Sequence, residues 1–431
     1  MNILVIGSGG REHAICLAFK RSPRVTRLFC ANGNAGIAQV AECVAIRPDD
    51  ISALADFASQ NAIDLTFVGG ETSLALGVVD EFESRGLRII GPTKHASQLE
   101  SSKAFAKDFM ARHGVPTAKY VTAHTPEFAS LELESGDFGG ANAPVVVKAD
   151  GLAAGKGVVV ATNRREAEIA INEMAGLVGS AASAKIVLEE CLVGREVSLL
   201  MFADGLDFAL MPAVRDHKRI GERDTGPNTG GMGTITDDSV LASQDLEEII
   251  ATIVRPTLHG CVREGFPFRG ILFLGLMMTA GGPKLLEYNV RFGDPETQSI
   301  LVRLETDLVD ICDAMLAGGA SQSDVSALAT LDIKWKPGSS ACVVLASQGY
   351  PASPRTGDPI NGLEAAGRVP NVTVFHAGTA NGPNGEFVTA GGRVLGVTAT
   401  GEILSSALSS AYSAASQISF DGMQYRKDIG R

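Results

Sequence analysis

The sequence predicts a multidomain protein of the α/β and α+β classes, with a parallel sheet at the N-terminus and a small β-rich unit at the C-terminus. Three observations lead to this prediction. Apolar runs alternate with helix-like segments over the first 100 residues, glycine-rich polar loops interrupt the middle of the chain, and short strands with turns dominate after residue 330. A length of 431 residues is enough for about three domains with buried cores.

The first 100 residues alternate strand-like and helix-like segments. Residues 2–6 form an apolar run that ends at Gly7, as expected of a buried strand, and residues 11–21 place apolar side chains at helical spacing. Because strands and helices alternate, we expect a parallel sheet whose ligand-binding edge lies at the carboxyl ends of its strands. Further strands are expected at 25–31, 63–68 and 87–90, and further helices at 51–60 and 71–85.

The middle of the chain mixes helices with hairpins. Residues 101–113 predict a helix that is capped by Ser101 and Ser102 and ends before Pro116. Residues 215–233 hold almost no apolar side chains, so we expect a long functional loop there. The remaining expected elements are a hairpin at 144–161, strands at 185–190, 196–202, 268–279 and 283–290, and helices at 163–175, 243–264, 305–317 and 401–417.

Composition excludes several classes of protein. The net charge is −12 and no basic run is present, which disfavours nucleic acid and anionic membranes as partners. The longest apolar run, 271–278, is too short to span a bilayer, and the N-terminus lacks the pattern of a signal peptide. The seven cysteines are scattered without a Cys-x-x-Cys pair, so we expect reduced thiols and a cytoplasmic location. Glycine is in excess, with 49 residues.

The first glycine cluster, Gly7-Ser-Gly9-Gly10-Arg11-Glu12, lies between the first strand and the first helix. Backbone amides at a helix N-terminus favour a bound phosphate, and Arg11 is a charge partner for one. A dinucleotide fingerprint needs glycine where Glu12 stands, so NAD binding is disfavoured. Taken alone, a tight strand–helix turn explains the cluster equally well.

A second glycine-rich segment, residues 151–157, follows the strand that contains Lys148 and includes Lys156. Its spacing differs from that of a Walker loop, but a flexible flap between two strands can fold over a triphosphate. An ordinary hairpin turn is the alternative. Lys148 argues against that alternative, because a lysine in an apolar strand needs an anionic partner.

The sharpest motif is the segment 286–298. Alternation along a strand places Glu287, Asn289 and Arg291 on one face. A carboxylate and an amide oxygen suit Mg²⁺, which takes few protein ligands and completes its shell with substrate phosphates. Arg291 beside them suits an anion that is formed or transferred. The alternative is an edge strand with a solvated polar face, which leaves the charged continuation Arg-Phe-Gly-Asp-Pro-Glu unexplained.

A pair of acids, Glu189 and Glu190, ends a strand shortly before the next strand begins at Glu196. Such a linker between two lobes could pair its backbone with the edge of an adenine. On its own, a solvated turn explains the segment better.

These motifs together resemble one family of enzymes. The order Lys148, glycine-rich flap, Glu189 to Glu196 and Glu-x-Asn-x-Arg is similar to that of ATP-grasp ligases. Among these, Arg-Phe-Gly-Asp-Pro-Glu-Thr-Gln at 291–298 resembles the signature of phosphoribosylamine–glycine ligases, also called glycinamide ribonucleotide synthetases. Further similar segments are 7–14, 102–118, 216–233 and 425–430.

The resemblance implies a fold with four parts. These are a Rossmann-like N-terminal domain at 1–100, an ATP-grasp core at 101–122 and 194–328, a small mobile lid at 123–193, and a β-rich C-terminal domain at 329–431. It also implies that ATP, glycine and 5-phosphoribosylamine give glycinamide ribonucleotide, ADP and phosphate through glycyl phosphate, with Mg²⁺ or Mn²⁺, in purine biosynthesis. The partners implied are these small molecules, with no nucleic acid and no membrane, a monomer, and a transient contact with the upstream amidotransferase.

The resemblance assigns roles to individual residues. For ATP it implies Lys103 and Lys148 at the phosphates, Lys156 on the flap, and Glu189, Glu190, Leu192 and Glu196 around the adenine and ribose. The implied metal ligands are Glu287 and Asn289, and the implied catalytic residues are Arg291, Lys218 and Asp216. The substrate-binding residues that it implies are Gly9, Gly10, Arg11, Glu12, Gly70, Glu71, Arg219 and Asp294.

Three alternatives stand beside this family. Another ATP-grasp carboxylate–amine ligase or carboxylase, such as a biotin carboxylase, shares Glu-x-Asn-x-Arg but lacks the Phe-Gly-Asp-Pro-Glu that follows here. A nucleotide-binding protein without catalysis should have lost residues of this motif, and a dehydrogenase is disfavoured by Glu12. Two departures from the family pattern concern the loop conformation: Arg215 replaces a glutamine, and the four residues from Thr234 replace Ala-Tyr-Ser-Pro.

Overall fold

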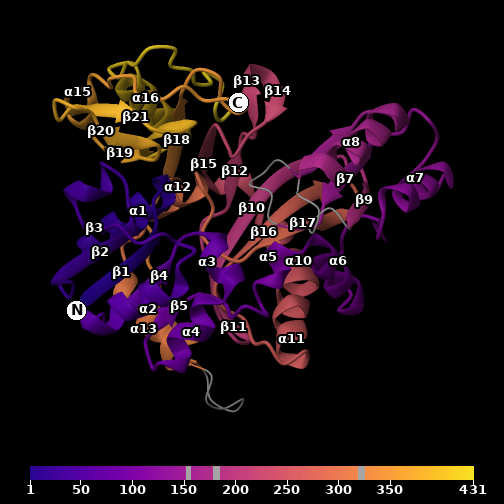
Figure 1. Cartoon of the computed structure of the whole chain (residues 1–431), viewed down its shortest axis with the longest axis horizontal. Coiled ribbons are helices and arrows are strands. Elements are labelled where there is room, and N and C mark those ends of the chain that lie inside the picture. The colour runs from indigo at the N-terminus through magenta and orange to yellow at the C-terminus, as the bar shows by residue number, and fades with distance from the viewer. Residues whose placement is uncertain (152–156, 178–184, 319–325) are drawn as a thin grey trace.

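The computed structural model describes the chain except for residues 152–156, 178–184 and 319–325 (Figure 1). A five-stranded parallel sheet forms the N-terminal part, and a four-stranded sheet forms a small unit that projects at the right of Figure 1. A nine-stranded sheet runs through the middle and C-terminal parts. The predicted combination of α/β and α+β architecture is therefore confirmed. No helix in the described part of the chain is both long and apolar enough to cross a membrane.

The N-terminal sheet has the strand order β3-β2-β1-β4-β5, and all its strands are parallel, as predicted. Residues 3–6 of the central strand are fully buried, because helices pack on both faces of the sheet. The order reverses between β1 and β4, so the glycine loops after these two strands meet at one edge. The short strand β3 was not predicted, because three residues show no alternation. The elements are β1 (Asn2–Gly7), α1 (Gly10–Lys20), β2 (Arg27–Asn32), η1 (Ile37–Gln39), β3 (Glu42–Val44), α2 (Ile51–Gln60), β4 (Leu65–Val68), α3 (Glu71–Leu76), α4 (Val78–Ser84) and β5 (Ile89–Ile90).

The small projecting unit holds the four-stranded sheet β6-β9-β7-β8 and two helices. The predicted hairpin is present, because β7 pairs antiparallel with β8 and Lys148 lies opposite Val158. Side chains of the helices and the sheet form a core of their own, which includes Leu133, Val147 and Ile171. The elements are β6 (Tyr120–Ala123), α7 (Pro126–Glu134), β7 (Val145–Ala149), β8 (Val158–Ala161), α8 (Arg164–Leu177) and β9 (Ile186–Glu190).

The largest sheet joins the middle of the chain to its C-terminal part. Its order is β17-β16-β10-β12-β15-β18-β22-β19, with β11 paired to β10. Antiparallel pairing of β15 with β18 carries the sheet across residue 329, where the sequence predicts a domain limit. Two segments of the chain therefore build one hydrogen-bonded layer. The strands are β10 (Arg195–Asp204), β11 (Asp207–Leu210), β12 (Val214–Asp216), β15 (Gly233–Thr236), β16 (Arg269–Thr279), β17 (Gly282–Asn289), β18 (Ser339–Ala346), β19 (Val372–His376) and β22 (Arg393–Gly401).

The helices around this sheet follow the sequence closely. The predicted helix at 101–113 is α6, and Ser102 caps it by accepting a hydrogen bond from the N–H of Phe105 at 3.1 Å. The predicted helix at 243–264 is one continuous run with a π-helical turn, η4, in its middle. The helices are α5 (Gln98–Ser101), α6 (Lys103–Arg112), α10 (Ser243–Ile249), η4 (Ile250–Val254), α11 (Arg255–Arg263), α12 (Glu296–Leu301), α13 (Leu308–Ala317), α14 (Ala327–Thr330), α15 (Leu363–Gly367) and α16 (Leu404–Ala415).

The segment 215–233, predicted as a long loop, is largely regular. After β12, its residues form a two-stranded ribbon of β13 (Arg219–Gly221) and β14 (Thr225–Asn228), joined by the short turn η2 (Glu222–Asp224). The prediction of a loop was wrong because the ribbon is built from backbone hydrogen bonds between polar residues, which leave no apolar periodicity in the sequence.

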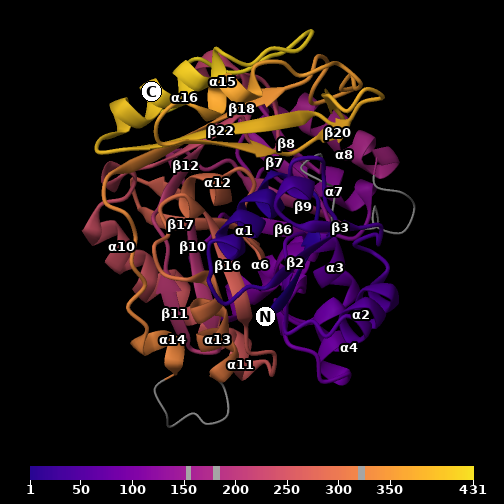
Figure 2. The same cartoon turned by 90° about the vertical axis from the view of Figure 1, so that its left-hand side faces the viewer.

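A pair of buried histidines joins the N-terminal sheet to the C-terminal strands. His13 on α1 is 4% exposed and His376 at the end of β19 is 5% exposed. The N–H of His376 donates to Nδ1 of His13 at 2.8 Å, where α1 lies against the C-terminal part (Figure 2). Burial lowers the pKa of His13 to about 3 and that of His376 to about 4, so both imidazoles are neutral in the folded protein at neutral pH.

We expect the free energy of unfolding to fall as the pH drops below 6.5, since the unfolded chain then protonates His13 and His376 while the folded chain does not. Each histidine accounts for a loss of about 2 kcal/mol between about pH 7.5 and about pH 5. In His13→Gln, residue 13 cannot titrate, so the loss in unfolding free energy between the two pH values should be smaller by about 2 kcal/mol. Urea unfolding at both pH values measures this difference. His259→Gln, on an exposed helix face, is the control. An unchanged pH dependence in His13→Gln would contradict this account.

Candidate active site

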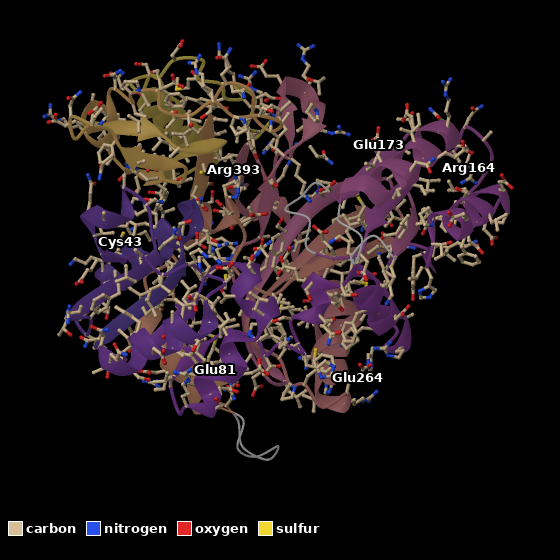
Figure 3. The ribbon with its side chains drawn as sticks, in the orientation of Figure 1. Cys43, Glu81, Arg164, Glu173, Glu264 and Arg393 are labelled. Atoms are coloured by element: carbon tan, nitrogen blue, oxygen red, sulfur yellow. The ribbon has the colours of Figure 1, made fainter. Side chains whose placement is uncertain are left out.

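The predicted site residues gather where the edge of the N-terminal sheet, the end of β17 and the small four-stranded sheet meet. Lys103, Lys148, Glu189 and Glu287 line one common hollow between α6, the small sheet and β17. Arg393 lies where the C-terminal strands meet the middle of the molecule, and it pairs with Asp294 (Figure 3). Residues from all the major sheets therefore contribute to one region.

The strand β17 carries the sharpest motif and is an edge strand of the large sheet. Tyr288 and Val290 are buried, whereas Glu287 and Asn289 lie on the partly exposed face, as alternation predicts. Gly275 pairs with Glu287 on the neighbouring strand, and a Cβ at this glycine would come within 3.2 Å of the glutamate side chain. The missing side chain at position 275 thus leaves room for Glu287.

Cations surround the Glu287 carboxylate. Burial would raise the pKa of Glu287, but the charges nearby outweigh burial and lower this pKa to about 2. The glutamate is therefore ionised at any physiological pH. The cations responsible are Lys218, Lys103, Lys148 and Arg291.

The pair Glu287 and Asn289 fits a divalent metal ion. Both side chains offer hard oxygen atoms from the same strand face, and the glutamate is held in its charged form. Within the described residues, no three histidine, cysteine or acidic side chains cluster closely enough to hold a metal by themselves. A metal here would need oxygen atoms of a substrate to complete its shell, which is typical of Mg²⁺ sites at phosphates.

Arg291 is fixed by two carboxylates. Its guanidinium lies 2.7 Å from Glu100 and 3.3 Å from Glu71, which begins α3 directly after Gly70. The second oxygen of Glu100 accepts a hydrogen bond of 2.8 Å from the N–H of Val290. Burial would raise the pKa of Glu71, but Arg291 and a second arginine outweigh it and lower this pKa to about 2. These contacts hold the arginine at the end of β17 with its side chain extended towards the N-terminal sheet.

Two buried lysines share the carboxylate of Glu189. Nζ of Lys107 lies 2.9 Å from one oxygen, and Nζ of Lys148 lies 2.7 Å from the other. Lys148 also donates to the backbone oxygen of Leu286 at 3.3 Å, which ties β7 to β17. Burial lowers the pKa of Lys107 to about 8. With both lysines protonated, Lys107, Lys148 and Glu189 together carry one net positive charge. All three side chains line the hollow that contains Glu287.

The other residues expected around a nucleotide lie along the connection from β9 to β10. The carboxylate of Glu190 accepts a hydrogen bond of 2.8 Å from the N–H of Lys119. Leu192 is half-buried in the connection itself. Glu196 on β10 is exposed and lies 3.1 Å from Nζ of Lys218. Glu189, at the start of this connection, lines the hollow and is already engaged by two lysines.

Glu12 fills the first glycine loop from within. One of its oxygens accepts a hydrogen bond of 2.6 Å from the N–H of Gly9, and the other lies 2.6 Å from Nε of Arg11. A Cβ at Gly69, in the loop after β4, would lie 2.2 Å from the same carboxylate. The glutamate thus shapes both loops, and Arg11 continues to the backbone oxygen of Phe292 at 3.1 Å. Gly10, the first residue of α1, borders this loop.

Asp294 is held between the N-terminal loop and the C-terminal strands. Its carboxylate lies 2.9 Å from the guanidinium of Arg393 and accepts a hydrogen bond of 2.7 Å from Gln298. Arg393 also donates to the backbone oxygens of Asp294 and Gly230. Burial would raise the pKa of Asp294, but Arg393 and Arg11 outweigh it and lower this pKa. The two arginines thus flank one carboxylate beside the glycine loop.

Asp216 and Lys218 lie on the segment that leads into the β13–β14 ribbon. Burial raises the pKa of Asp216, and the neighbouring Glu296 adds to this effect. Within the described residues, Oδ1 of Asp216 has no hydrogen-bond partner. Burial opposes the charge of Lys218, but Glu196, Glu287 and Asp216 outweigh it and raise the pKa of this lysine. Arg219, by contrast, turns into the ribbon, where it donates to the backbone oxygen of Gly226 at 2.7 Å.

Sequence reasoning missed several polar residues of this region. Lys107 lies four residues after Lys103 on the buried face of α6, so helical spacing was the signal that could have found it. Glu296 lies within the motif at 291–298 but was given no role, and Glu100 and Arg393 come from separate elements and have no spacing signal. Lys156 and the flap residues 152–156 lie outside the described residues.

The arrangement first defines the class of the protein. A hollow between two sheets, lined by lysines and by Glu287 at the start of a Glu-x-Asn-x-Arg strand, is the arrangement of ATP-grasp enzymes. The fold is similar to that of a solved biotin carboxylase from Campylobacter jejuni, with a TM-score of 0.73, 15% identity, and coverage of 98% of this chain and 92% of the other. At this identity the likeness concerns the fold alone.

The particular family follows from comparison along the whole chain. Family models for phosphoribosylglycinamide synthetase match its N domain at residues 1–100, its ATP-grasp (A) domain at 101–297 and its C domain at 340–431. The chain belongs to this family. The expectations of an ATP-dependent ligase and of the ATP-grasp fold are thereby confirmed, and the carboxylase alternative is not favoured.

Individual relatives agree with the family models over their full length. The phosphoribosylamine–glycine ligase of Xanthomonas campestris pv. campestris is 47% identical, over 100% of this chain and 97% of the relative. That of Vibrio vulnificus is also 47% identical, over 100% and 98%. The solved phosphoribosylamine–glycine ligase of Thermotoga maritima has a TM-score of 0.82, 33% identity, and coverage of 100% of both chains.

We expect Lys107→Met to weaken ATP binding about tenfold while the protein stays folded. The substitution removes one charge from the Lys107–Glu189–Lys148 group, so Glu189 neutralises Lys148 and less positive charge faces the phosphates. Isothermal titration of ATP measures the effect. Lys20→Met, at the exposed end of α1, is the matched control. An ATP affinity within twofold of wild type would contradict a role for the shared carboxylate.

Proposed function

We propose that this chain joins glycine to 5-phosphoribosylamine at the expense of ATP and produces glycinamide ribonucleotide, ADP and phosphate in purine biosynthesis. The observation that carries the proposal is the strand Glu287–Asn289–Arg291 surrounded by lysines. Transfer of a phosphoryl group to a carboxylate gathers negative charge, and fixed cations stabilise such charge in the transition state. Membership of the phosphoribosylglycinamide synthetase family supplies the substrates.

The reaction proceeds in two displacements. A carboxylate oxygen of glycine attacks the terminal phosphorus of ATP, the bond to ADP breaks, and glycyl phosphate forms. The amine of phosphoribosylamine then attacks the acyl carbon and loses a proton, and phosphate leaves with the electrons of the carbon–oxygen bond. The protein contributes by binding and orienting the three substrates, because neither displacement needs a covalent intermediate on the enzyme.

The nucleotide side is assigned to the hollow between the two sheets. Lys103 and Lys148 bind the phosphates, and Lys156 adds a charge from the flap. Glu287 and Asn289 would hold Mg²⁺ or Mn²⁺, and the bound ion would neutralise negative charge on the phosphates. Support comes from the shared hollow and from the charged state of Glu287. The adenine and ribose are assigned to the connection formed by Glu189, Glu190, Leu192 and Glu196.

The acceptor side is assigned to the glycine loops and the residues that face them. Arg11 and Arg393 flank Asp294 and bind the phosphate of phosphoribosylamine between the N-terminal and C-terminal parts. Arg291 stabilises the phosphoryl group during transfer, and its fixed position between Glu71 and Glu100 supports this role. The remaining assignments are Asp216 and Lys218 near the reacting groups, Arg219 on their outer side, and Gly9, Gly10, Glu12 and Gly70 along the loops.

The setting of the reaction completes the proposal. The domain limits are proposed at 1–100, at 101–122 with 194–328, at 123–193 and at 329–431, with the third part acting as a lid. The enzyme is proposed to act in the cytoplasm as a monomer that receives labile phosphoribosylamine through a transient contact with the amidotransferase that makes it. Small molecules are its substrates, and the net charge of −12 argues against nucleic acid as a partner.

The central test is substrate dependence. We expect ADP release to require both glycine and freshly prepared phosphoribosylamine, because the acyl phosphate must be consumed for turnover. A coupled assay for ADP measures this requirement, and each substrate is omitted in turn. Release of ADP with bicarbonate in place of glycine would instead identify a carboxylase and overturn the proposal.

We expect Glu287→Gln to lower kcat by at least about 100-fold, because the variant removes the charge that holds the metal beside the transferred phosphoryl group. Far-ultraviolet circular dichroism should stay unchanged, since the side chain lies on the partly exposed face of an edge strand. Glu364→Gln, on the exposed surface of α15, serves as the control. Near-normal metal-dependent turnover in Glu287→Gln would refute the metal assignment.

A further inference from the structure

The β13–β14 ribbon lacks a hydrophobic core of its own. Its residues 222–228 are all exposed, and the two strands form an isolated sheet of two. Lys218 directly precedes this ribbon, and its backbone oxygen accepts hydrogen bonds from both the N–H and the hydroxyl of Thr229 at 2.8 Å. The position of the lysine therefore depends on what holds an otherwise exposed ribbon in place.

The C-terminal tail, residues 425–431, supplies that hold. In Figure 1 the C-terminus lies beside β13 and β14. Arg426 of the tail is only 2% exposed, although it is a charged residue near the end of the chain. Its guanidinium lies 2.7 Å from Asp224, donates to the backbone oxygen of Arg219 at 3.1 Å, and makes two hydrogen bonds of 2.8 and 2.9 Å to Asp428. One buried side chain thus joins the tail to the start of β13 and to the end of the turn η2.

The turn held in this way has a strained backbone. Arg223 and Asp224 have φ angles of 55° and 53°, in the left-handed region that side chains other than glycine rarely adopt. The tail engages both residues: the N–H of Arg223 donates to Asp428 at 2.7 Å, and the carboxylate of Asp224 pairs with Arg426. Such a conformation persists only where neighbouring groups enforce it, and here those groups belong to the tail.

The tail also meets the residue just before Lys218. His217 is 3% exposed, its Nδ1 donates to the backbone oxygen of Gly233, and its Nε2 accepts a hydrogen bond of 3.1 Å from the N–H of Gly430. Ile429 packs so closely that a Cβ at Gly233 would lie 2.8 Å from it. Tail contacts therefore hold the chain on both sides of Lys218, through the side chain of His217 and the backbone of Arg219.

We propose that the C-terminal tail is a clamp that positions Lys218 at the site, and that Arg426 is its central positioning residue. The inference rests on the proposed role of Lys218 and deepens it. Arg426 touches no reacting atom; it acts through Arg219 and Asp224. In the clamped position, Nζ of Lys218 lies 3.1 Å from Glu196 and close to Glu287, so a shift of the ribbon would move this cation away from the phosphoryl group.

The test compares Arg426→Ala, Arg426→Lys and Asp224→Asn with Arg355→Ala. Arg355 is a matched control, because it is an exposed arginine that also bridges two aspartates, at Asp358 and Asp421. Steady-state kinetics, ATP titration and hydrogen exchange of the Arg223 amide are measured for each protein. If Arg426→Ala fails to fold, Asp224→Asn decides alone, because Asp224 is largely exposed and leaves the Arg426–Asp428 pair intact.

We expect Arg426→Ala to lower kcat about tenfold or more, with ATP affinity within twofold of wild type and faster exchange at Arg223. Arg426→Lys should restore part of kcat, Asp224→Asn should lower kcat less, and Arg355→Ala should match wild type. Wild-type kcat in Asp224→Asn and Arg426→Ala, or a parallel loss of ATP affinity and kcat, would overturn the clamp. Lys218→Met separates the two proposals. If Lys218→Met keeps the wild-type kcat, the proposed role of Lys218 is wrong. If Lys218→Met is inactive but Arg426→Ala is active, only the proposed clamp is wrong.

Discussion

The charge of Glu287 among its surrounding cations is the interaction on which the site depends. Four cations lower the pKa of this carboxylate to about 2, and each of them comes from a different part of the chain. Lysines come from α6, from β7 of the small sheet and from the segment before the β13–β14 ribbon, and the arginine follows β17. Because like charges repel, this gathering is stable only if other acids compensate it. Those acids are Glu189, Glu196, Glu100 and Glu71.

The compensating acids also explain why the cations are well placed for phosphoryl transfer. Glu189 pairs with Lys148, whose amino group also donates to the backbone of β17. Glu100 anchors Arg291, and its second oxygen binds the N–H of Val290 just after that strand. Side chains fixed in this way lose little further freedom when a charged substrate binds, so more of the binding energy is available to the transition state. The ribbon is fixed in a similar way, because the buried Arg426 donates a hydrogen bond to its backbone at Arg219.

The sequence predicted the parts of this molecule that rest on local patterns. Strand–helix alternation located the N-terminal sheet, the hairpin around Lys148 followed from two apolar runs, and strand alternation placed Glu287 and Asn289 on one face. What it missed depends on contacts between distant segments. Arg393 on β22 pairs with Asp294, which lies far from it in the sequence. The ribbon at 219–228 has no apolar pattern. Neither feature has a local signature, because each exists only once the chain is folded.

The pairing of β15 with β18 has a consequence for the synthesis of the chain. Strand β15 borders β12 on one side, and its other side is closed only by β18, which follows about a hundred residues later. While the ribosome is still making the intervening segment, the emerging sheet has an open edge with unpaired backbone groups, and such edges invite pairing with other chains. During synthesis, β18 therefore covers the open edge of a sheet whose strand β15 was made about a hundred residues earlier. A chain that terminates before β18 would leave its largest sheet unprotected rather than lose a dispensable appendage.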